Sequence, residues 1–329
     1  MTQDSTVLVT GGAGYIGSHT VRALVEAGRN VVVLDSLEYG SADSVLGAPL
    51  VAGDIADEDA VEQLCRDHDV GALVHFAAYK AVGESMEQPG RYWHNNVDKS
   101  VSLFEAVIRA GVRDVVFSSS CSVNGNPASV PVAESAAIAP ESVYAETKAT
   151  VERVLHWFGV TAGLRSVSLR YFNAAGASFD NRIGEDWTRA LNLVPLVMKS
   201  ILLDDRPLTL YGTDYDTPDG TCIRDYIHVV DLADAHVRAL AALSADAVPQ
   251  RATAVNVGTG VGTSVRELID RAERVTGRHV PCEVGPRRAG DPAATYADPS
   301  LAHSLLGWEA RHGIDDILAT AYAWHSKTS

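Results

Sequence analysis

The sequence predicts a doubly wound α/β fold, in which helices cover both faces of a parallel sheet, with a smaller α/β lobe after it. Two observations predict the sheet: short apolar runs alternate with helix-length segments, and a glycine-rich turn follows the first run. The runs span residues 6–9, 30–34, 50–52, 72–76, 114–117 and 167–171. Each is too short for a helix and too apolar for a half-exposed strand, as expected of strands joined by βαβ crossovers.

The pattern changes after about Asn173. Stretches rich in glycine, aspartate and proline, such as 212–220 and 285–292, alternate there with helical segments such as 265–275. We therefore expect a first domain over residues 1–172 and a second lobe over residues 173–329. A helix predicted over 226–243 and a strand predicted over 255–257 lie in a segment, near 226–258, that we expect to return to the first domain.

The composition is that of a folded protein with an acidic surface. Of the 329 residues, 46% are hydrophobic and 21% are charged, unlike disordered chains. There are 42 aspartates and glutamates against 27 lysines and arginines, a net charge of -15, and such a surface repels nucleic acid. No run approaches the roughly 18 apolar residues of a membrane span. We expect neither nucleic acid nor a membrane as a partner.

Cysteine usage indicates a reducing compartment. Cys65, Cys121, Cys222 and Cys282 stand far apart, without the spacing of a disulfide framework or of a zinc site. Residues 1–5 lack the basic start of a signal peptide. We therefore expect a cytoplasmic location and no bound metal.

A glycine-rich turn, residues 10–17, joins the first apolar run to a helix. Glycines let the backbone approach a pyrophosphate, whose charge is met by free N–H groups at the helix start. Asp35 closes the second strand about 20 residues on, where an acid that binds ribose is expected. It is followed by Ser36 and not by arginine, so NAD is favoured over NADP. A plain βα turn, with Asp35 an ordinary turn residue, is the alternative.

Polar residues and turns also follow the later strands. Asp54 and Ile55 follow the third, Phe76 and Ala77 the fourth, residues 118–120 the fifth, and Asn173 the sixth. Ligands of open α/β sheets bind beyond the carboxyl ends of the strands. We therefore expect these residues to converge on one crevice.

Tyr144 and Lys148 stand four apart in a segment of helical periodicity, so both face the same way. A tyrosine with a pKa of about 10 is a poor base, and a neighbouring ammonium together with the nicotinamide charge would favour its phenolate. Alone the pair is only suggestive. The serines at 118–120 add weight, because a hydroxyl there could bond a substrate oxygen and relay its proton.

Taken together, these motifs resemble those of the extended short-chain dehydrogenase/reductase superfamily. Within that superfamily the sequence resembles the UDP-glucose 4-epimerase family, also called the UDP-galactose 4-epimerases. The resemblance spans nearly the whole chain and implies a Rossmann-type first domain that binds NAD and a second lobe that binds a UDP-sugar. The stretches that carry it are residues 11–20 (GGAGYIGSHT), 75–85 (HFAAYKAVGES), 95–97 (NNV), 117–120 (FSSS), 144–148 (YxxxK), 170–177 (RYFNAAGA), 219–236 and 287–292 (RRAGDP).

The resemblance also implies roles for individual residues. It implies that Tyr144 is the catalytic base, that Ser120 is its partner at the substrate 4-hydroxyl, and that Lys148 binds the nicotinamide ribose. The implied cofactor contacts are Gly11, Gly14, Tyr15, Ile16, Asp35, Asp54, Ile55, Phe76, Ala77, Lys80, Asn95, Ser118, Tyr144, Lys148 and Tyr171. The implied substrate contacts are Ser120, Tyr144, Asn173, Asn192, Arg224, Arg288, Asp291 and Thr295.

The implied reaction is an isomerisation of UDP-glucose and UDP-galactose through a 4-keto sugar, with NAD regenerated each turnover. Sugar-nucleotide dehydratases of the same fold place an Asp-Glu pair after the serine or threonine of the fifth strand, whereas Ser120 is followed by Cys121 and Ser122. A dehydratase is therefore not expected. The resemblance further implies a homodimer through the helices near 96–110 and 144–158.

The chain departs from the family pattern in three places. Asn124 stands where many relatives have tyrosine, and Ala145 and Glu146 replace a usual Gly-Lys pair. Thr295 stands where some relatives have a bulky tyrosine and others a small cysteine that leaves room for an N-acetyl group. UDP-N-acetylhexosamines are therefore hypothesised as further substrates. An epimerase of another NDP-sugar and a non-catalytic NAD or nucleotide-sugar binder are the alternatives.

Overall fold

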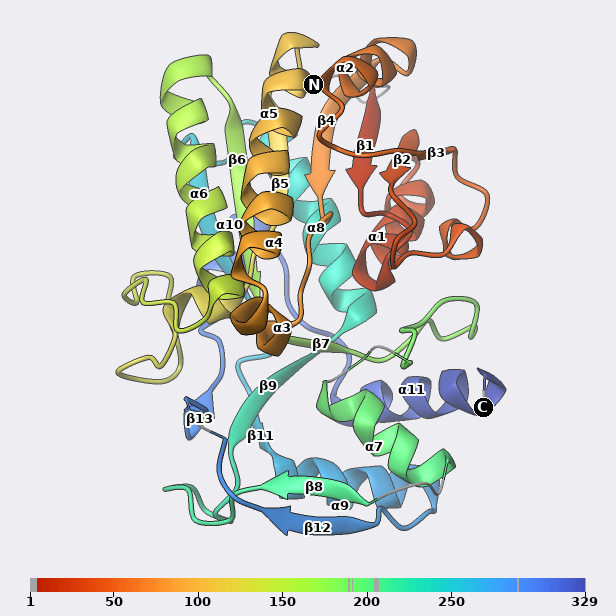
Figure 1. The fold of residues 1–329 in the computed structure, drawn as a ribbon, viewed down its shortest axis with the longest axis vertical. Helices are drawn as coiled ribbons and strands as arrows, with labels where there is room; N and C mark the ends of the chain where they lie inside the picture. Colours follow the sequence, from red (N-terminus) through yellow and green to blue (C-terminus); the bar gives the residue numbers. More distant parts are fainter. Residues whose placement is uncertain (1–4, 189, 191, 204–206, 289, 329) are drawn as a thin grey trace.

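The computed structural model describes residues 5–188, 190, 192–203, 207–288 and 290–328. Its centre is a seven-stranded sheet in the order β10-β6-β5-β4-β1-β2-β3 (Figure 1), and every pairing is parallel. The strands are β1 (Thr6–Thr10), β2 (Val31–Asp35), β3 (Leu50–Ala52), β4 (Val70–His75), β5 (Asp114–Ser118), β6 (Arg165–Tyr171) and β10 (Ala252–Val257). The predicted doubly wound sheet is confirmed, and each of the six apolar runs forms one strand.

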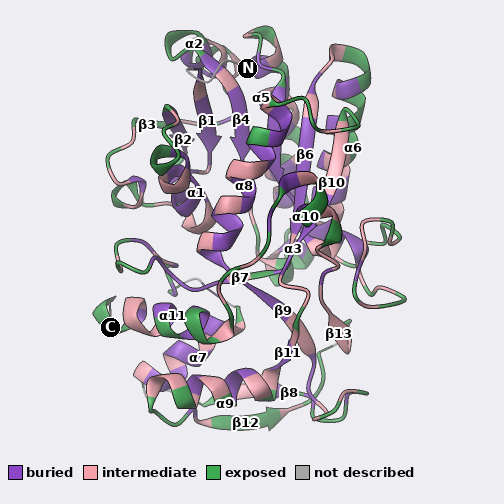
Figure 2. Cartoon of the chain, turned by 180° about the vertical axis from the view of Figure 1, so that it is seen from behind, coloured by how far each residue is buried: buried purple, intermediate pink, exposed green. Residues whose placement is uncertain are grey.

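Helices cover both faces of this sheet. One face carries α1 (Tyr15–Glu26), α8 (Val229–Ser244) and α10 (Ser300–Leu306), and the other α2 (Glu58–Asp67), α5 (Lys99–Arg109) and α6 (Val143–Ala162). Successive side chains of a strand point to opposite faces. Val7 and Val9 therefore lie in the core beneath α1 and α8, and Leu8 in the core beneath α2 and α5. Figure 2 shows the resulting band of buried strands.

The second lobe is built around β9 (Ile223–His228), which pairs with β7 (Asn173–Ala175), β11 (Gly262–Ser264) and β13 (Ala294–Thr295). A separate pair consists of β8 (Leu208–Tyr211) and β12 (Cys282–Gly285), and helices α7 (Leu193–Leu202), α9 (Val265–Thr276) and α11 (Ile314–Thr328) share the core of this lobe. Short elements are η1 (Ala42–Val45), α3 (Val82–Glu87), α4 (Pro89–Trp93), η2 (His94–Asp98) and η3 (Cys121–Asn124).

The chain crosses between the lobes more than once. After β9 it returns to the large sheet as α8 and β10, and then leaves again for β11 and α9. The helix predicted over 226–243 is wrong at its start, because residues 226–228 belong to β9. There Tyr226 and Ile227 pair with β7, and α8 begins only where His228 accepts a hydrogen bond from Val230 N at 3.1 Å.

Two kinds of feature are absent from the described residues. None of their helices is both long enough and apolar enough to cross a membrane. They also contain no group of three or more His, Cys, Asp or Glu side chains placed to hold a metal ion.

Buried histidines make the folded state sensitive to acid. Burial lowers the pKa of His75 and His228 to about 3, and of His19, His236 and His325 to about 4. In the unfolded chain a histidine binds its proton near pH 6.5. The stability that these neutral rings contribute is therefore complete above pH 6.5 and is lost as pH falls from there towards 4 and 3.

We expect the free energy of unfolding to fall below pH 6.5 by about 1.4 kcal/mol per pH unit for each histidine that takes up a proton. Urea unfolding between pH 7.5 and 5 measures this slope. His75→Phe should reduce this slope by the contribution of one proton. Changing the exposed His94 to Phe should leave the slope unaltered. A pH-independent midpoint would contradict the prediction.

Candidate active site

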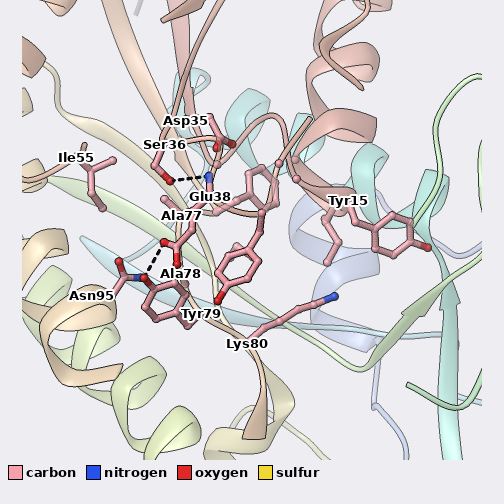
Figure 3. Close-up of a pocket in the computed structure, with 18 of the residues that line it drawn as sticks. Tyr15, Asp35, Ser36, Glu38, Ile55, Ala77, Ala78, Tyr79, Lys80 and Asn95 are labelled. Atoms are coloured by element: carbon pink, nitrogen blue, oxygen red, sulfur yellow. Dashed lines mark hydrogen bonds between the residues drawn. The ribbon is translucent and has the colours of Figure 1, made fainter. Parts of the chain in front are cut away.

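A cavity of about 420 Å³ lies at the carboxyl ends of β1 to β6, where ligands of parallel α/β sheets bind. All the residues for which the resemblance implies cofactor contact line it. They are Gly11, Gly14, Tyr15, Ile16, Asp35, Asp54, Ile55, Phe76, Ala77, Lys80, Asn95, Ser118, Tyr144, Lys148 and Tyr171. Figure 3 shows part of this lining. The structure thus brings side chains from six strand ends into one place.

The turn after β1 is shaped by its glycines. Gly11 has φ +72°, and a Cβ there would stand 2.6 Å from Ala77 N; a Cβ on Gly17 would stand 2.2 Å from Gly11 O. Only glycine fits this spacing. No side chain caps the start of α1, and its first turn contains no acidic residue. The N–H groups at the helix start therefore suit an anionic ligand.

Asp35 is held in a fixed orientation at the end of β2. Its Oδ2 accepts a hydrogen bond from Ala13 N at 2.9 Å, and its Oδ1 accepts one from Leu37 N at 2.8 Å. Each carboxylate oxygen keeps a further acceptor site, which suits ribose hydroxyls. The glycine turn and this acid together fit NAD, and the carboxylate disfavours a 2′-phosphate.

Tyr144 and Lys148 lie in the first turns of α6, which begins where Ser142 Oγ accepts a hydrogen bond from Ala145 N. Both side chains are buried, and Lys148 Nζ stands 5.9 Å from the Tyr144 ring centre. Lys148 Nζ donates to Ser118 O at 2.7 Å. Lys148 therefore holds the end of β5 in place and also places its amino group near Tyr144.

Burial dominates the titration of this pair. It raises the pKa of Tyr144 well above its ordinary value, with Tyr171 adding to the shift and the hydrogen bond of Ser120 opposing it. Burial also lowers the pKa of Lys148 to about 7, against the attraction of Glu152. Burial therefore disfavours the Tyr144 phenolate, and it remains a prediction that the Lys148 ammonium and the nicotinamide charge together favour it.

Ser120 is buried at the start of η3, and its Oγ accepts hydrogen bonds from Ser122 N at 3.2 Å and Ser122 Oγ at 2.9 Å. Beside it, Ser118 Oγ bonds the Tyr171 hydroxyl at 2.9 Å. Of the two serines, Ser120 also hydrogen-bonds the phenol of Tyr144. The arrangement suits a hydroxyl that holds a substrate oxygen near a tyrosine base.

A buried ion pair contacts Ser119, next to Ser120, and the sequence reasoning missed this pair. Arg170 Nη2 lies 2.6 Å from Glu152 Oε2, with both side chains nearly buried. Ser119 Oγ donates to Glu152 Oε1 at 2.5 Å. Glu152 stands one helical turn beyond Lys148, so the i, i+4 spacing that pointed to the Tyr-Lys pair could have found it.

Apart from Tyr144, the expected substrate residues do not line this cavity, and most of them lie on the second lobe. Asn173, Arg224 and Thr295 occupy β7, β9 and β13 of one small sheet, and Thr295 is paired with Arg224. Arg224 Nη2 lies 3.6 Å from Asp291 Oδ1. Arg288 O accepts a hydrogen bond from Asp291 N at 3.4 Å, and the Arg288 guanidinium packs over the Tyr211 ring at 3.9 Å. Asn192 directly precedes α7.

Two other predicted positions have partners within the protein. Lys80 Nζ donates to Glu185 Oε1 at 2.8 Å, and this glutamate also lines the cavity. Asn124 is buried, and its Nδ2 donates to Ala136 O at 3.2 Å and Ala137 O at 3.0 Å. Asn124, which departs from the family pattern, thus holds the loop at residues 136–137 against the segment that follows Ser120.

Comparison with known proteins agrees with this geometry. The model of the NAD dependent epimerase/dehydratase family matches residues 7–258. A UDP-glucose 4-epimerase of Azospirillum brasilense is 45% identical over 97% of this chain and 91% of its own length. The structure of UDP-glucose 4-epimerase from Brucella ovis in complex with NAD has a TM-score of 0.94 and 44% identity, covering 98% of each chain.

A second solved structure is equally similar. It is the UDP-glucose-4-epimerase from Stenotrophomonas maltophila with bound NAD and formylated UDP-arabinopyranose, with a TM-score of 0.94 and 42% identity over 98% of each chain. The resemblance seen in the sequence motifs is therefore confirmed along almost the whole chain. The protein belongs to the NAD dependent epimerase/dehydratase family.

Proposed function

We propose that this protein is an NAD-dependent isomerase that interconverts UDP-glucose and UDP-galactose by epimerisation at C4 through a 4-keto intermediate. The observation that carries the proposal is that Tyr144 and Lys148 of α6 meet Ser118 and Ser120 at the end of β5, beside a cavity that fits NAD. The relatives that bind NAD and a UDP-sugar derivative support it.

In this reaction Tyr144 Oη takes the proton of the substrate 4-hydroxyl and later returns it, with Ser120 holding the same oxygen. When bound, NAD supplies the hydride acceptor and a positive ring charge that favours the Tyr144 phenolate. Lys148, whose pKa lies at about 7, adds its charge when protonated.

The UDP moiety would be held by the second lobe. Arg224 and Arg288 supply guanidinium groups that suit a diphosphate on a chain whose net charge is -15. Arg224 is held by Pro292 O at 2.8 Å, while Asn173 Nδ2 donates to Asp225 O at 3.0 Å. Anchoring through the diphosphate leaves the hexose free to present either face to the base.

The decisive experiment is to incubate the purified protein with UDP-galactose, without added cofactor, and to resolve the products by NMR. Conversion to UDP-glucose is expected, because the proposed reaction regenerates its NAD. A lack of conversion even with added NAD would reject the proposed activity. Retained NAD without turnover would instead identify a non-catalytic binder.

Thr295 is expected to admit N-acetylated sugars, because it is small and shares a strand pairing with Arg224. Thr295→Tyr should abolish conversion of UDP-N-acetylgalactosamine and spare UDP-galactose. The matched variant Thr295→Cys should retain both. Parallel NMR assays of the two substrates test this, and loss of both activities together in the tyrosine variant would refute it.

Other NDP-sugars are less favoured as substrates. Asn124 was the family departure that left other NDP-sugars as an alternative, and its side-chain amide donates hydrogen bonds to the backbone of residues 136 and 137. The similar proteins named above are UDP-glucose 4-epimerases.

We also propose a homodimer and a cytoplasmic location. Trp157 and Val160 of α6 are 62% and 59% exposed, and the nearby surface groove between α5 and α6 includes Val101 and Phe158. This apolar surface supports pairing of two copies through these helices, which sedimentation analysis can measure.

The four cysteines are free thiols, consistent with a reducing compartment.

A further inference from the structure

Side chains from two separate loops meet across the rim of the cofactor cavity. The loop after β2 carries Glu38 and Tyr39, the loop after β4 carries Tyr79, and α4 carries Arg91. Arg91 Nη2 donates to Glu38 Oε1 at 2.8 Å and to the Tyr39 hydroxyl at 2.9 Å. The Tyr79 hydroxyl donates to Glu38 Oε2 at 2.8 Å (Figure 3). Both carboxylate oxygens of Glu38 are therefore engaged by the opposite loop and helix.

Arg91 is itself fixed on the β4 side of the rim. Its Nη1 bonds Glu84 of α3, and the Tyr92 hydroxyl donates to the other oxygen of Glu84 at 2.8 Å. The guanidinium carbon lies 4.2 Å above the Tyr79 ring, and that ring meets the Tyr39 ring edge-on at 5.7 Å. One side of the arginine is thus anchored while the other reaches across to Glu38.

These contacts enclose the part of the cavity next to Asp35. Glu38, Tyr39, Tyr79 and Glu84 line the same cavity as Asp35, and Glu38 lies only three residues beyond that acid. A dinucleotide bound there would sit beneath the bridge between the two loops. Its departure requires the bridge to open.

We propose that Glu38, Tyr79 and Arg91 form a latch across the rim that retains the bound dinucleotide. This inference rests on the proposed function, in which NAD is regenerated at every turnover, so the rim has no need to open between turnovers. Breaking the latch therefore speeds cofactor release and leaves the chemistry at Tyr144 unaltered.

The test measures the rate at which bound NAD leaves the protein. Wild type, Glu38→Gln, Tyr79→Phe and Arg91→Met are saturated with radiolabelled NAD and mixed with excess unlabelled NAD, and the label that remains bound is followed in time. Glu38→Gln and Arg91→Met should release NAD about tenfold faster, and Tyr79→Phe about threefold faster, because a partly exposed ion pair and one hydrogen bond are lost.

Two further measurements separate a latch from general loosening. Glu38→Gln/Arg91→Met should release NAD no faster than the faster single variant, because both changes remove the same bridge. High salt should speed release from wild type more than from Glu38→Gln. Asp315→Asn is the matched control: it breaks the Arg271 pair between α9 and α11, of similar exposure, and should release NAD at the wild-type rate.

The outcomes of these measurements distinguish failure of the latch proposal from failure of the proposed function. If Glu38→Gln and Tyr79→Phe hold NAD as long as wild type does, the latch is refuted while the proposed function stands. If wild type neither retains nor takes up NAD, the proposed function fails, and the latch with it. Should Arg91→Met not fold, the two remaining variants decide the question.

Discussion

Replacing Tyr144 by phenylalanine is expected to lower the turnover of UDP-galactose by about two to four orders of magnitude, the contribution of a positioned acid–base group. Only the proton acceptor is removed, because the ring fills the same buried space and the backbone N–H of residue 144 still donates to Ser85 Oγ. Bound NAD should remain at the wild-type level. Single-turnover and steady-state assays, with NAD content measured after denaturation, test both parts.

The control is Tyr322→Phe, the same chemical change on α11 of the second lobe, where the hydroxyl only accepts a hydrogen bond from Arg278. It should turn over UDP-galactose as wild type does. Wild-type rates in Tyr144→Phe would remove this residue from the mechanism. Loss of NAD together with activity would point to a role in binding the cofactor.

The second large effect concerns stability. Arg170→Met should lower the free energy of unfolding by about 3–5 kcal/mol, because it leaves the carboxylate of Glu152 buried without its cation. Ser119 remains as the partner of that carboxylate, which is too little to compensate a buried charge. Urea unfolding at pH 7.5 measures the change.

Two variants show whether the unpaired charge is the cause. Glu152→Met/Arg170→Met removes both charges and should recover most of the loss. Arg109→Met breaks the more exposed pairs with Glu58 and Glu62 and should change stability by less than about 1 kcal/mol per pair. An Arg170→Met protein as stable as wild type would contradict the prediction.

The large sheet could be predicted from the sequence because its central strands, such as β2 and β5, are buried on both faces. Such strands appear as continuous apolar runs, and glycine or polar residues mark their ends. The part of the cavity lining that follows the strands, such as Asp54 and Ser118, could be predicted for the same reason, since residues at the carboxyl ends of parallel strands share one edge. Lys80 and Asn95 were implied only by the family resemblance. The Tyr144 and Lys148 pair could be recognised by its helical spacing.

The strand pairing of the second lobe and the contacts at the rim could not be predicted in this way. Residues 226–228 continue the helical periodicity of α8, but pairing with β7 makes them a strand. The contacts of Glu38 with Tyr79 and Arg91 join positions 41 and 53 residues apart, and no local pattern reports such a distance. The raised pKa of Tyr144 depends on burial by several elements, which spacing along one helix does not reveal.

The repeated crossing of the chain between the lobes has a consequence for biosynthesis. The strand that completes the large sheet beside β6, β10, emerges from the ribosome only after β7, β8 and β9. Until then the nascent chain exposes the open edge of β6 and the apolar surface that α8 later covers, both of which favour aggregation. The first lobe therefore cannot finish folding during translation before much of the second has been made, and no single cut in the polypeptide yields two independent folding units.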